Sequence, residues 1–234
     1  MAAPPTVIAL DTATEYCSVA IARDRTVMQC EVEAGQSHSQ RLLPLLQQIL
    51  GEHGLTLRDI DGIAFGAGPG SFTGLRIACG IAQGLAYGLD VPVVPVSNLQ
   101  ALAMAARTAA PQAARVGVAL DARMHEAYWA VYEFVGAIPE QLAPPALVAL
   151  ADLGPTLARF GIDTAAGNAF VLVAGPAGTT VLPRVRATAA EVAQLGLARL
   201  QAGEGVAAHQ AAPLYVRDRV AQTVGERRAA RSAA

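Results

Sequence analysis

The chain has 234 residues, enough for two domains of about 110 residues that each bury a core. No apolar run reaches the ~18 residues of a membrane span, and the segment Met1–Pro5 lacks the basic flank of a secretory signal, so we expect a cytoplasmic protein without a membrane segment. A formal net charge of −2 argues against binding nucleic acid through overall charge. All 17 basic residues are arginine, which excludes a P-loop lysine and a lysine general base.

The first half of the chain alternates strand and helix signals. A capping box, Ser37 with Gln40 three residues on, marks the start of its first helix. The predicted elements are a strand at 8–11, a polar turn and a second strand within 12–21, a strand at 26–32, a helix at 37–50, a strand at 62–65, a helix at 71–87 and a strand at 91–96. This order is that of a ribonuclease H-like domain.

The second half begins with a short copy of the first. Ile8-Ala-Leu-Asp11 is matched by Val118-Ala-Leu-Asp121, and each segment predicts a buried strand, a polar turn opened by the aspartate and a second strand. The match is Ala-rich, so chance similarity is the alternative to duplication. We favour duplication because the aspartate falls at the same point in both copies.

The remaining elements of the second half have weaker signals. They are strands at 116–119 and 127–132, a Pro-rich connection at 139–145, a helix at 152–160, a strand at 170–174 and a helix at 189–201. We therefore predict an α/β protein with subdomains at 1–107 and 108–224. The small, basic segment 225–234 is expected to be a disordered tail.

Two turns and one loop are candidates for binding a nucleotide. Asp11 and Thr12, with Asp121 as the equivalent, either approach phosphates and their metal or only cap the turns they open, and the sequence favours neither. The loop Gly66–Gly74 joins a strand to a helix, where backbone amides bind anions. We favour the alternative that its glycines let two backbones approach closely.

The helix after this loop has almost no polar face. Gly80, Gly84 and Gly88 fall four residues apart, and each interior glycine costs about 1 kcal/mol of helix stability relative to alanine. Close packing against another helix would compensate. Either the helix at 37–50 covers this face within the chain, or both helices share a face that a second protein completes; we favour the second interpretation.

Metal and nucleophile signals are weak. The four histidines contain no pair spaced i, i+4, so no H-x-x-x-H ligand pair exists, and the three cysteines form no C-x-x-C motif. We predict no catalytic residue and no metal site.

Taken together, the motifs resemble the TsaB (YeaZ) family of tRNA threonylcarbamoyladenosine biosynthesis proteins, densely up to about residue 135. The most specific stretch is Gly66-Ala-Gly-Pro-Gly-Ser-Phe-Thr-Gly-Leu-Arg76. The other similar stretches are Leu10-Asp-Thr-Ala-Thr14, His38-Ser-Gln-Arg-Leu-Leu-Pro44, Ala82-Gln-Gly-Leu-Ala86, Val94-Pro-Val-Ser97, Asp121-Ala-Arg123, Pro213-Leu-Tyr-Val-Arg217 and Val220-Ala221.

The resemblance implies an actin-like ATPase (ASKHA) fold of two ribonuclease H-like subdomains. It also implies a cytoplasmic, non-catalytic partner and activator of the catalytic paralogue TsaD, with the ATPase TsaE joining the complex and tRNA bound only through that complex. The complex modifies an adenosine beside the anticodon. No cofactor is expected to bind tightly to this chain; ATP or ADP at the partner interface stays open, and Gly167-Asn-Ala-Phe170 departs from the turn that holds an adenosine.

Carried over by position, two helices form the partner-binding surface, and the free subunit is expected to form a homodimer. The residues assigned to this surface are Ser39, Leu42, Leu43, Leu46, Ser71, Phe72, Thr73, Leu75, Arg76, Gly80, Gln83 and Gly84. The competing functions are a metallopeptidase of the glycoprotease type, an independent ATP-dependent kinase of the same fold and a homodimeric interaction module. The kinase requires Asp11 and Asp121 to face each other across a cleft.

Overall fold

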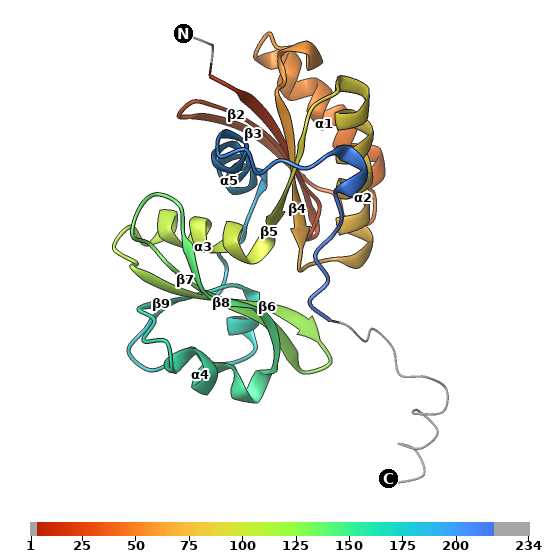
Figure 1. Cartoon of the computed structure of the whole chain (residues 1–234). Helices are drawn as coiled ribbons and strands as arrows, with labels where there is room; N and C mark the ends of the chain where they lie inside the picture. Colours follow the sequence, from red (N-terminus) through yellow and green to blue (C-terminus); the bar gives the residue numbers. More distant parts are fainter. Residues whose placement is uncertain (1–3, 218–234) are drawn as a thin grey trace, which may run out of the picture.

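A computed structural model describes residues 4–217 and contains two five-stranded sheets (Figure 1). The first sheet has the order β3-β2-β1-β4-β5, in which β1, β2 and β3 are antiparallel and β4 and β5 run parallel to β1. Its strands are β1 (Thr6–Asp11), β2 (Tyr16–Arg23), β3 (Thr26–Glu33), β4 (Gly62–Gly68) and β5 (Val93–Ser97).

The second sheet repeats the first strand for strand. Its order is β8-β7-β6-β9-β10, again with three antiparallel strands followed by two parallel ones. Its strands are β6 (Arg115–Arg123), β7 (Glu126–Glu133), β8 (Glu140–Ala149), β9 (Thr164–Ala166) and β10 (Thr180–Leu182). The shared order confirms the predicted duplication and the ribonuclease H-like subdomains, because chance similarity of four residues would not reproduce a whole sheet.

Five α-helices cover the two sheets in layers. The helices are α1 (His38–Glu52), α2 (Phe72–Leu89), α3 (Asn98–Ala109), α4 (Leu150–Ala158) and α5 (Ala189–Gln201). Helices α1 and α2 lie on the outer face of the first sheet, and α4 lies on the outer face of the second. Helices α3 and α5 contact each other between the sheets.

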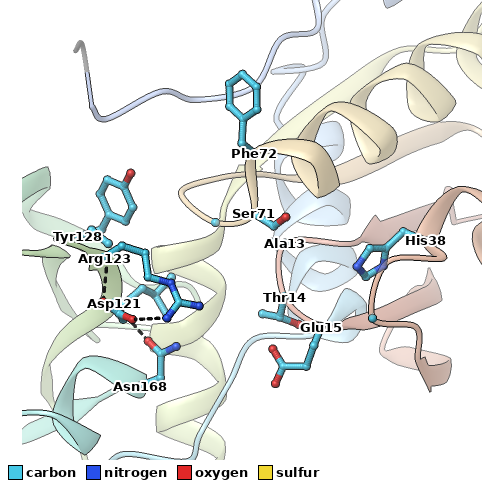
Figure 2. Close-up of a pocket in the computed structure, with 14 residues that line it drawn as sticks. Ala13, Thr14, Glu15, His38, Ser71, Phe72, Asp121, Arg123, Tyr128 and Asn168 are labelled. Atoms are coloured by element: carbon cyan, nitrogen blue, oxygen red, sulfur yellow. Dashed lines mark hydrogen bonds and ion pairs between the residues drawn. The ribbon is translucent and has the colours of Figure 1, made fainter. Parts of the chain in front are cut away.

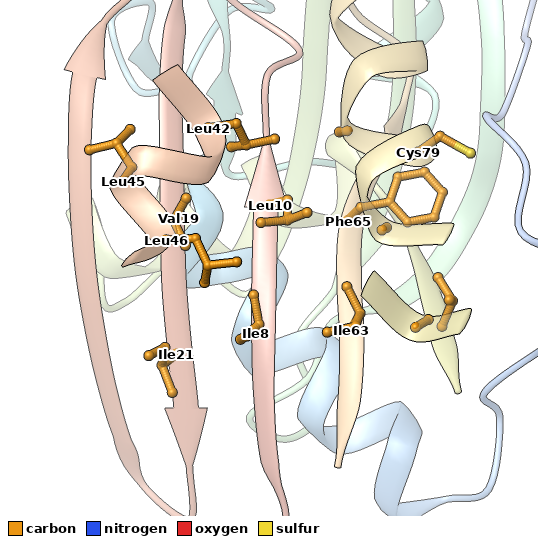
Figure 3. Packing of buried hydrophobic residues seen from close by; sticks show 14 of the residues in the cluster. Ile8, Leu10, Val19, Ile21, Leu42, Leu45, Leu46, Ile63, Phe65 and Cys79 are labelled. Atoms are coloured by element: carbon orange, nitrogen blue, oxygen red, sulfur yellow. The ribbon is translucent and has the colours of Figure 1, made fainter. Parts of the chain in front are cut away.

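Strand β1 is the central strand of the first sheet. It is buried on both faces, which explains its continuous apolar sequence. Ile8 and Leu10 face α1 and α2, where they pack with Leu42, Leu46 and Phe65 (Figure 3). Val7 and Ala9 face α5 instead. Alternate side chains of one strand thus join two cores, as the twofold period of a strand requires.

Helix α5 corrects the predicted domain organisation. We assigned 189–201 to the second subdomain, but α5 packs on β1, β2 and β4 of the first sheet. Gly196 permits this contact, because a Cβ atom there would lie 2.4 Å from the Cβ atom of Ala64. The predicted boundary between residues 107 and 108 also falls inside α3, which packs on the second sheet. The two halves therefore exchange the helices that follow their last strands.

Four further local predictions differ from the structure. Helix α3 was not among the predicted elements. The Pro-rich connection at 139–145 is largely strand β8, which tolerates its two prolines because it lies at the edge of its sheet. The strand expected at 170–174 is a 3₁₀ helix at 168–171 and a turn, and the hydroxyl of Ser37 donates to the carbonyl of Ala34 instead of capping α1. The tail predicted at 225–234 lies outside the described residues.

Candidate functional site

A cleft of about 490 Å³ opens between the two halves (Figure 2). The β1–β2 turn and the start of α2 form one wall, and the end of β6, where it enters the β6–β7 turn, forms the other. The polar residues that line it are Thr14, Glu15, His38, Ser71, Asp121, Arg123, Tyr128 and Asn168. The cleft combines two carboxylates, one arginine and several hydroxyl and amide groups.

Asp11 does not line this cleft, although it ends the strand that leads there. Its carboxylate is buried and accepts hydrogen bonds from the backbone amide of Ala13, at 2.7 Å, and from the side-chain amide of Asn98, also at 2.7 Å. Thr12 is buried as well, and its hydroxyl donates to the carbonyl of Gly74 at 2.7 Å. Both side chains therefore fasten the β1–β2 turn to neighbouring elements, as the turn-capping interpretation proposed.

Asp121 repeats the same turn in the second half. Its carboxylate accepts from the backbone amide of Arg123 at 2.8 Å, and its own amide donates to the side-chain oxygen of Asn168 at 2.8 Å. In contrast to Asp11, it lines the cleft. The kinase alternative required the two aspartates to face each other, and the buried position of Asp11 does not provide that geometry.

The glycine loop is held by internal hydrogen bonds. The amide of Gly68 donates to Asn98, that of Ser71 to the carbonyl of Ala13, and that of Gly74 to the hydroxyl of Ser71. A Cβ atom at position 74 would lie 1.8 Å from the carbonyl oxygen of Thr12. These three amides do not fit a phosphate because they already have acceptors, and the favoured prediction of close backbone approach is confirmed.

The charge state of Asp11 gives a test of this buried network. Burial raises the pKa of Asp11 to about 6, against the lowering effect of its Ala13 and Asn98 hydrogen bonds. Because the folded pKa lies above the ordinary 3.8, this carboxyl favours folding at low pH, and its contribution is lost as the pH rises from about 4 to about 6. The loss amounts to about 3 kcal/mol.

We therefore expect the stability of the natural chain, relative to an Asp11→Asn variant, to fall by about 3 kcal/mol between pH 4 and pH 7. The measurement is urea unfolding of both proteins across this range. In the variant, the amide at position 11 faces the amide of Asn98. Any repulsion between them changes the free energy of unfolding by an amount that does not depend on pH. Parallel stability curves would show that Asp11 titrates normally.

A second candidate surface is the outer face of α1 and α2. Gly80, Gly84 and Gly88 are exposed, and apart from the adjoining backbone of α2 no atom of the described residues lies within 4 Å of the position that a Cβ would take. Helix α1 therefore does not cover the glycines, which excludes the first of the two predicted interpretations. Leu43 on α1 is 43% exposed and Tyr87 on α2 is 86% exposed.

Of the residues assigned to the partner surface, most are exposed and the others are buried or half-buried. The exposed members are Ser39, Leu43, Ser71, Phe72, Thr73, Arg76, Gly80 and Gly84. Leu42, Leu46 and Leu75 are at most 2% exposed, so their assignment is wrong: they pack inward. Gln83 is half-buried, with its amide nitrogen bound to the carbonyl of Ala211.

Several residues that shape these surfaces were missed from the sequence. Asn98 connects Asp11 to the amide of Gly68, and Asn168 supports the second turn. His38 reaches the cleft from α1, and burial lowers its pKa. His38 and Asn168 stand in the quoted stretches His38–Pro44 and Gly167–Phe170, but nothing in those stretches pointed to the cleft.

Comparison with known proteins identifies the family. The family model described as "TsaD: tRNA N6-adenosine threonylcarbamoyltransferase" matches residues 32–175. A crystal structure from Pseudomonas aeruginosa, titled as an uncharacterized protein with similarity to peptidase YEAZ, is 36% identical with a TM-score of 0.84 and covers 91% of this chain and 100% of its own. The chain belongs to the TsaB (YeaZ) family.

Other family members give the same result. "YeaZ from Pseudomonas aeruginosa" is 35% identical, with a TM-score of 0.80, and covers 90% of this chain and 99% of its own. A Haemophilus influenzae protein named tRNA threonylcarbamoyladenosine biosynthesis protein TsaB is 50% identical over 53% of this chain and 52% of its own length. The Escherichia coli protein of the same name is 50% identical over 54% of each. The chain thus spans about half the length of these curated relatives.

The described part of the chain contains neither a metal-binding cluster nor a membrane-spanning helix. Within residues 4–217, no three or more His, Cys, Asp or Glu side chains are grouped so that they could hold a metal ion. No helix in that part of the chain is long and apolar enough to cross a membrane.

Proposed function

We propose that this family member acts in tRNA threonylcarbamoyladenosine biosynthesis as a non-catalytic subunit. In this proposal it binds and activates a TsaD-type catalytic subunit, a TsaE-type ATPase joins the pair, and tRNA binds only through the complex. The curated names of its relatives support the biosynthetic role. The match to the TsaD family model supports kinship with the catalytic paralogue.

The observation that carries the partner role is the open glycine face of α2. Gly80 and Gly84 lie in the interior of an 18-residue helix, where each weakens the helix by about 1 kcal/mol relative to alanine. Among residues 4–217, no other element approaches them to compensate. A helix of another protein is the partner that fits, because glycine allows two helix axes to approach closely.

The non-catalytic part of the proposal rests on how the candidate polar groups are used. The carboxylate of Asp11 accepts from Ala13 and Asn98, and the Gly68, Ser71 and Gly74 amides donate to Asn98, to the Ala13 carbonyl and to the Ser71 hydroxyl. These groups hold the first half together and are not available to a phosphate. ATP or ADP would accordingly bind at the interface with a partner, if the complex uses one.

A drop-out assay tests the proposal. Threonylcarbamoyl transfer to tRNA is measured with purified TsaD-type, TsaE-type and threonylcarbamoyl-AMP-forming proteins, with and without this chain. We expect transfer to require the chain, and the chain alone to transfer nothing. Full transfer in the absence of this chain would refute the partner role. An independent kinase or a homodimeric interaction module would then explain the chain better.

A further inference from the structure

The last part of the described chain, residues 205–217, forms a strap that runs along α2 toward the second half (Figure 1). Val206 pairs with Val93 at the free edge of β5, with two hydrogen bonds of 2.8 Å. Farther along, the carbonyl of Ala211 accepts from Gln83, and the amide of Leu214 donates to the carbonyl of Ala67 at 2.7 Å. The strap is therefore fixed to the first half along most of its length.

The strap then crosses the exposed start of α2. The hydroxyl of Tyr215 accepts a hydrogen bond from Nε of Arg76 at 3.0 Å, and the Tyr215 ring lies 5.9 Å from that of Phe72. The Arg76 guanidinium stacks over Phe72 at 3.8 Å. This aromatic and arginine cluster joins the strap to the outer face of α2.

Two residues later, the strap reaches the second half through Arg217. Its guanidinium forms an ion pair with Glu126 at 2.6 Å and donates to the carbonyl of Ala122 at 3.1 Å. The same side chain lies 3.5 Å from the sulfur of Met124 and is only 15% exposed. Arg217 thus contacts the β6–β7 turn at both of its ends, Ala122 and Glu126, and at its tip, Met124.

That turn has an unusual backbone. Arg123, Met124 and His125 have φ values of 63°, 55° and 60°, three successive non-glycine residues in the left-handed region. Such conformations persist only where the surroundings hold them in place. Arg217 provides part of that support from outside, and Asp121 accepts the Arg123 amide from inside. Asp121 and Arg123, at the start of this β6–β7 turn, line the cleft.

We infer that the strap is a latch that couples the outer face of α2 to the wall of the cleft. Arg217 is a positioning residue: it holds the left-handed turn, and Tyr215 holds Arg217 in place by its contacts with Arg76 and Phe72. A change at the start of α2 is thereby transmitted over the strap to Asp121 and Arg123. The latch belongs to the chain itself and does not depend on the identity of any partner.

Residue-resolved amide hydrogen exchange of the full chain tests the latch. The Arg123 amide reports on the turn, and the amides of β1 report on the overall fold. We expect Arg217→Gln to accelerate exchange at Arg123 about tenfold, the factor that corresponds to one lost charge-assisted hydrogen bond. Tyr215→Ala, which leaves Arg217 intact, should accelerate exchange at the same amide. Arg159→Gln, at the exposed residue that follows α4, serves as the control.

The two variants separate a latch from a local ion pair. Faster exchange at Arg123 in both, with β1 unchanged, supports the coupling. No change at Arg123 in Tyr215→Ala would overturn it, since Arg217 would then act without the strap; no change in Arg217→Gln would overturn the positioning role. If the β1 amides also exchange faster in Tyr215→Ala, the overall fold is affected, and Tyr215→Phe is measured instead because it removes only the hydroxyl. No change at the Arg123 amide in Tyr215→Phe would then overturn the coupling.

Discussion

Replacing Gly80 and Gly84 together by leucine is expected to abolish association with the TsaD-type partner while the chain stays folded. Both positions are exposed, and apart from the adjoining backbone of α2 no atom of the described part of the chain lies within 4 Å of a new Cβ. Inside a closely packed helix pair, however, each leucine would force the axes apart at a cost of about 1–3 kcal/mol. The affinity should fall at least about a hundredfold.

The measurement is titration calorimetry with the partner, alongside sedimentation of the chain alone, since we expect the same face to support a homodimer. Ala151→Leu, an exposed position on α4, adds the same side chain elsewhere and should leave both results unchanged. Thermal unfolding guards against misfolding: the double variant should be no less stable than the natural chain, because leucine is a better helix former than glycine. Unchanged affinity would remove the glycine face from the interface.

The second large effect is expected from Gly74→Ala, in the same helix. The new Cβ would lie 1.8 Å from the carbonyl oxygen of Thr12, which is backbone and cannot rotate away. Thr12 is also tied to this position, because its hydroxyl donates to the Gly74 carbonyl. Relieving the clash must separate α2 from the β1–β2 turn. We expect a loss of at least about 4 kcal/mol of stability, a large part of the total for a small domain.

Gly80→Ala is the matched control, with the identical substitution six residues farther along α2. It should raise the free energy of unfolding by up to about 1 kcal/mol, since position 80 is open. Urea unfolding of the two variants measures the difference directly. A Gly74→Ala variant within 1 kcal/mol of Gly80→Ala would mean that the turn and the helix move apart freely, contrary to the hydrogen bonds that join them.

Local sequence patterns sufficed for the strands and helices up to the end of β5. These elements follow periods of two and about 3.6 residues, and those periods are properties of the backbone that need no knowledge of the rest of the molecule. The duplicated Ala-Leu-Asp segments likewise predicted two similar sheets, and the buried capping role of Asp11 was one of two stated interpretations. The resemblance to the TsaB family rested on stretches that were all visible in the sequence.

Tertiary contacts decided the rest. Helix α3 is apolar on several sides because it lies between two sheets, and β8 contains prolines because it lies at a sheet edge; neither position is visible in a local pattern. Leu42 and Gly80 lie on helices that share one outer layer, yet only the folded arrangement shows that the leucine faces the sheet and the glycine faces solvent. Arg217 binds Glu126, which lies 91 residues away in the sequence. This contact depends on how the two halves pack together, and no local pattern in the sequence predicts it.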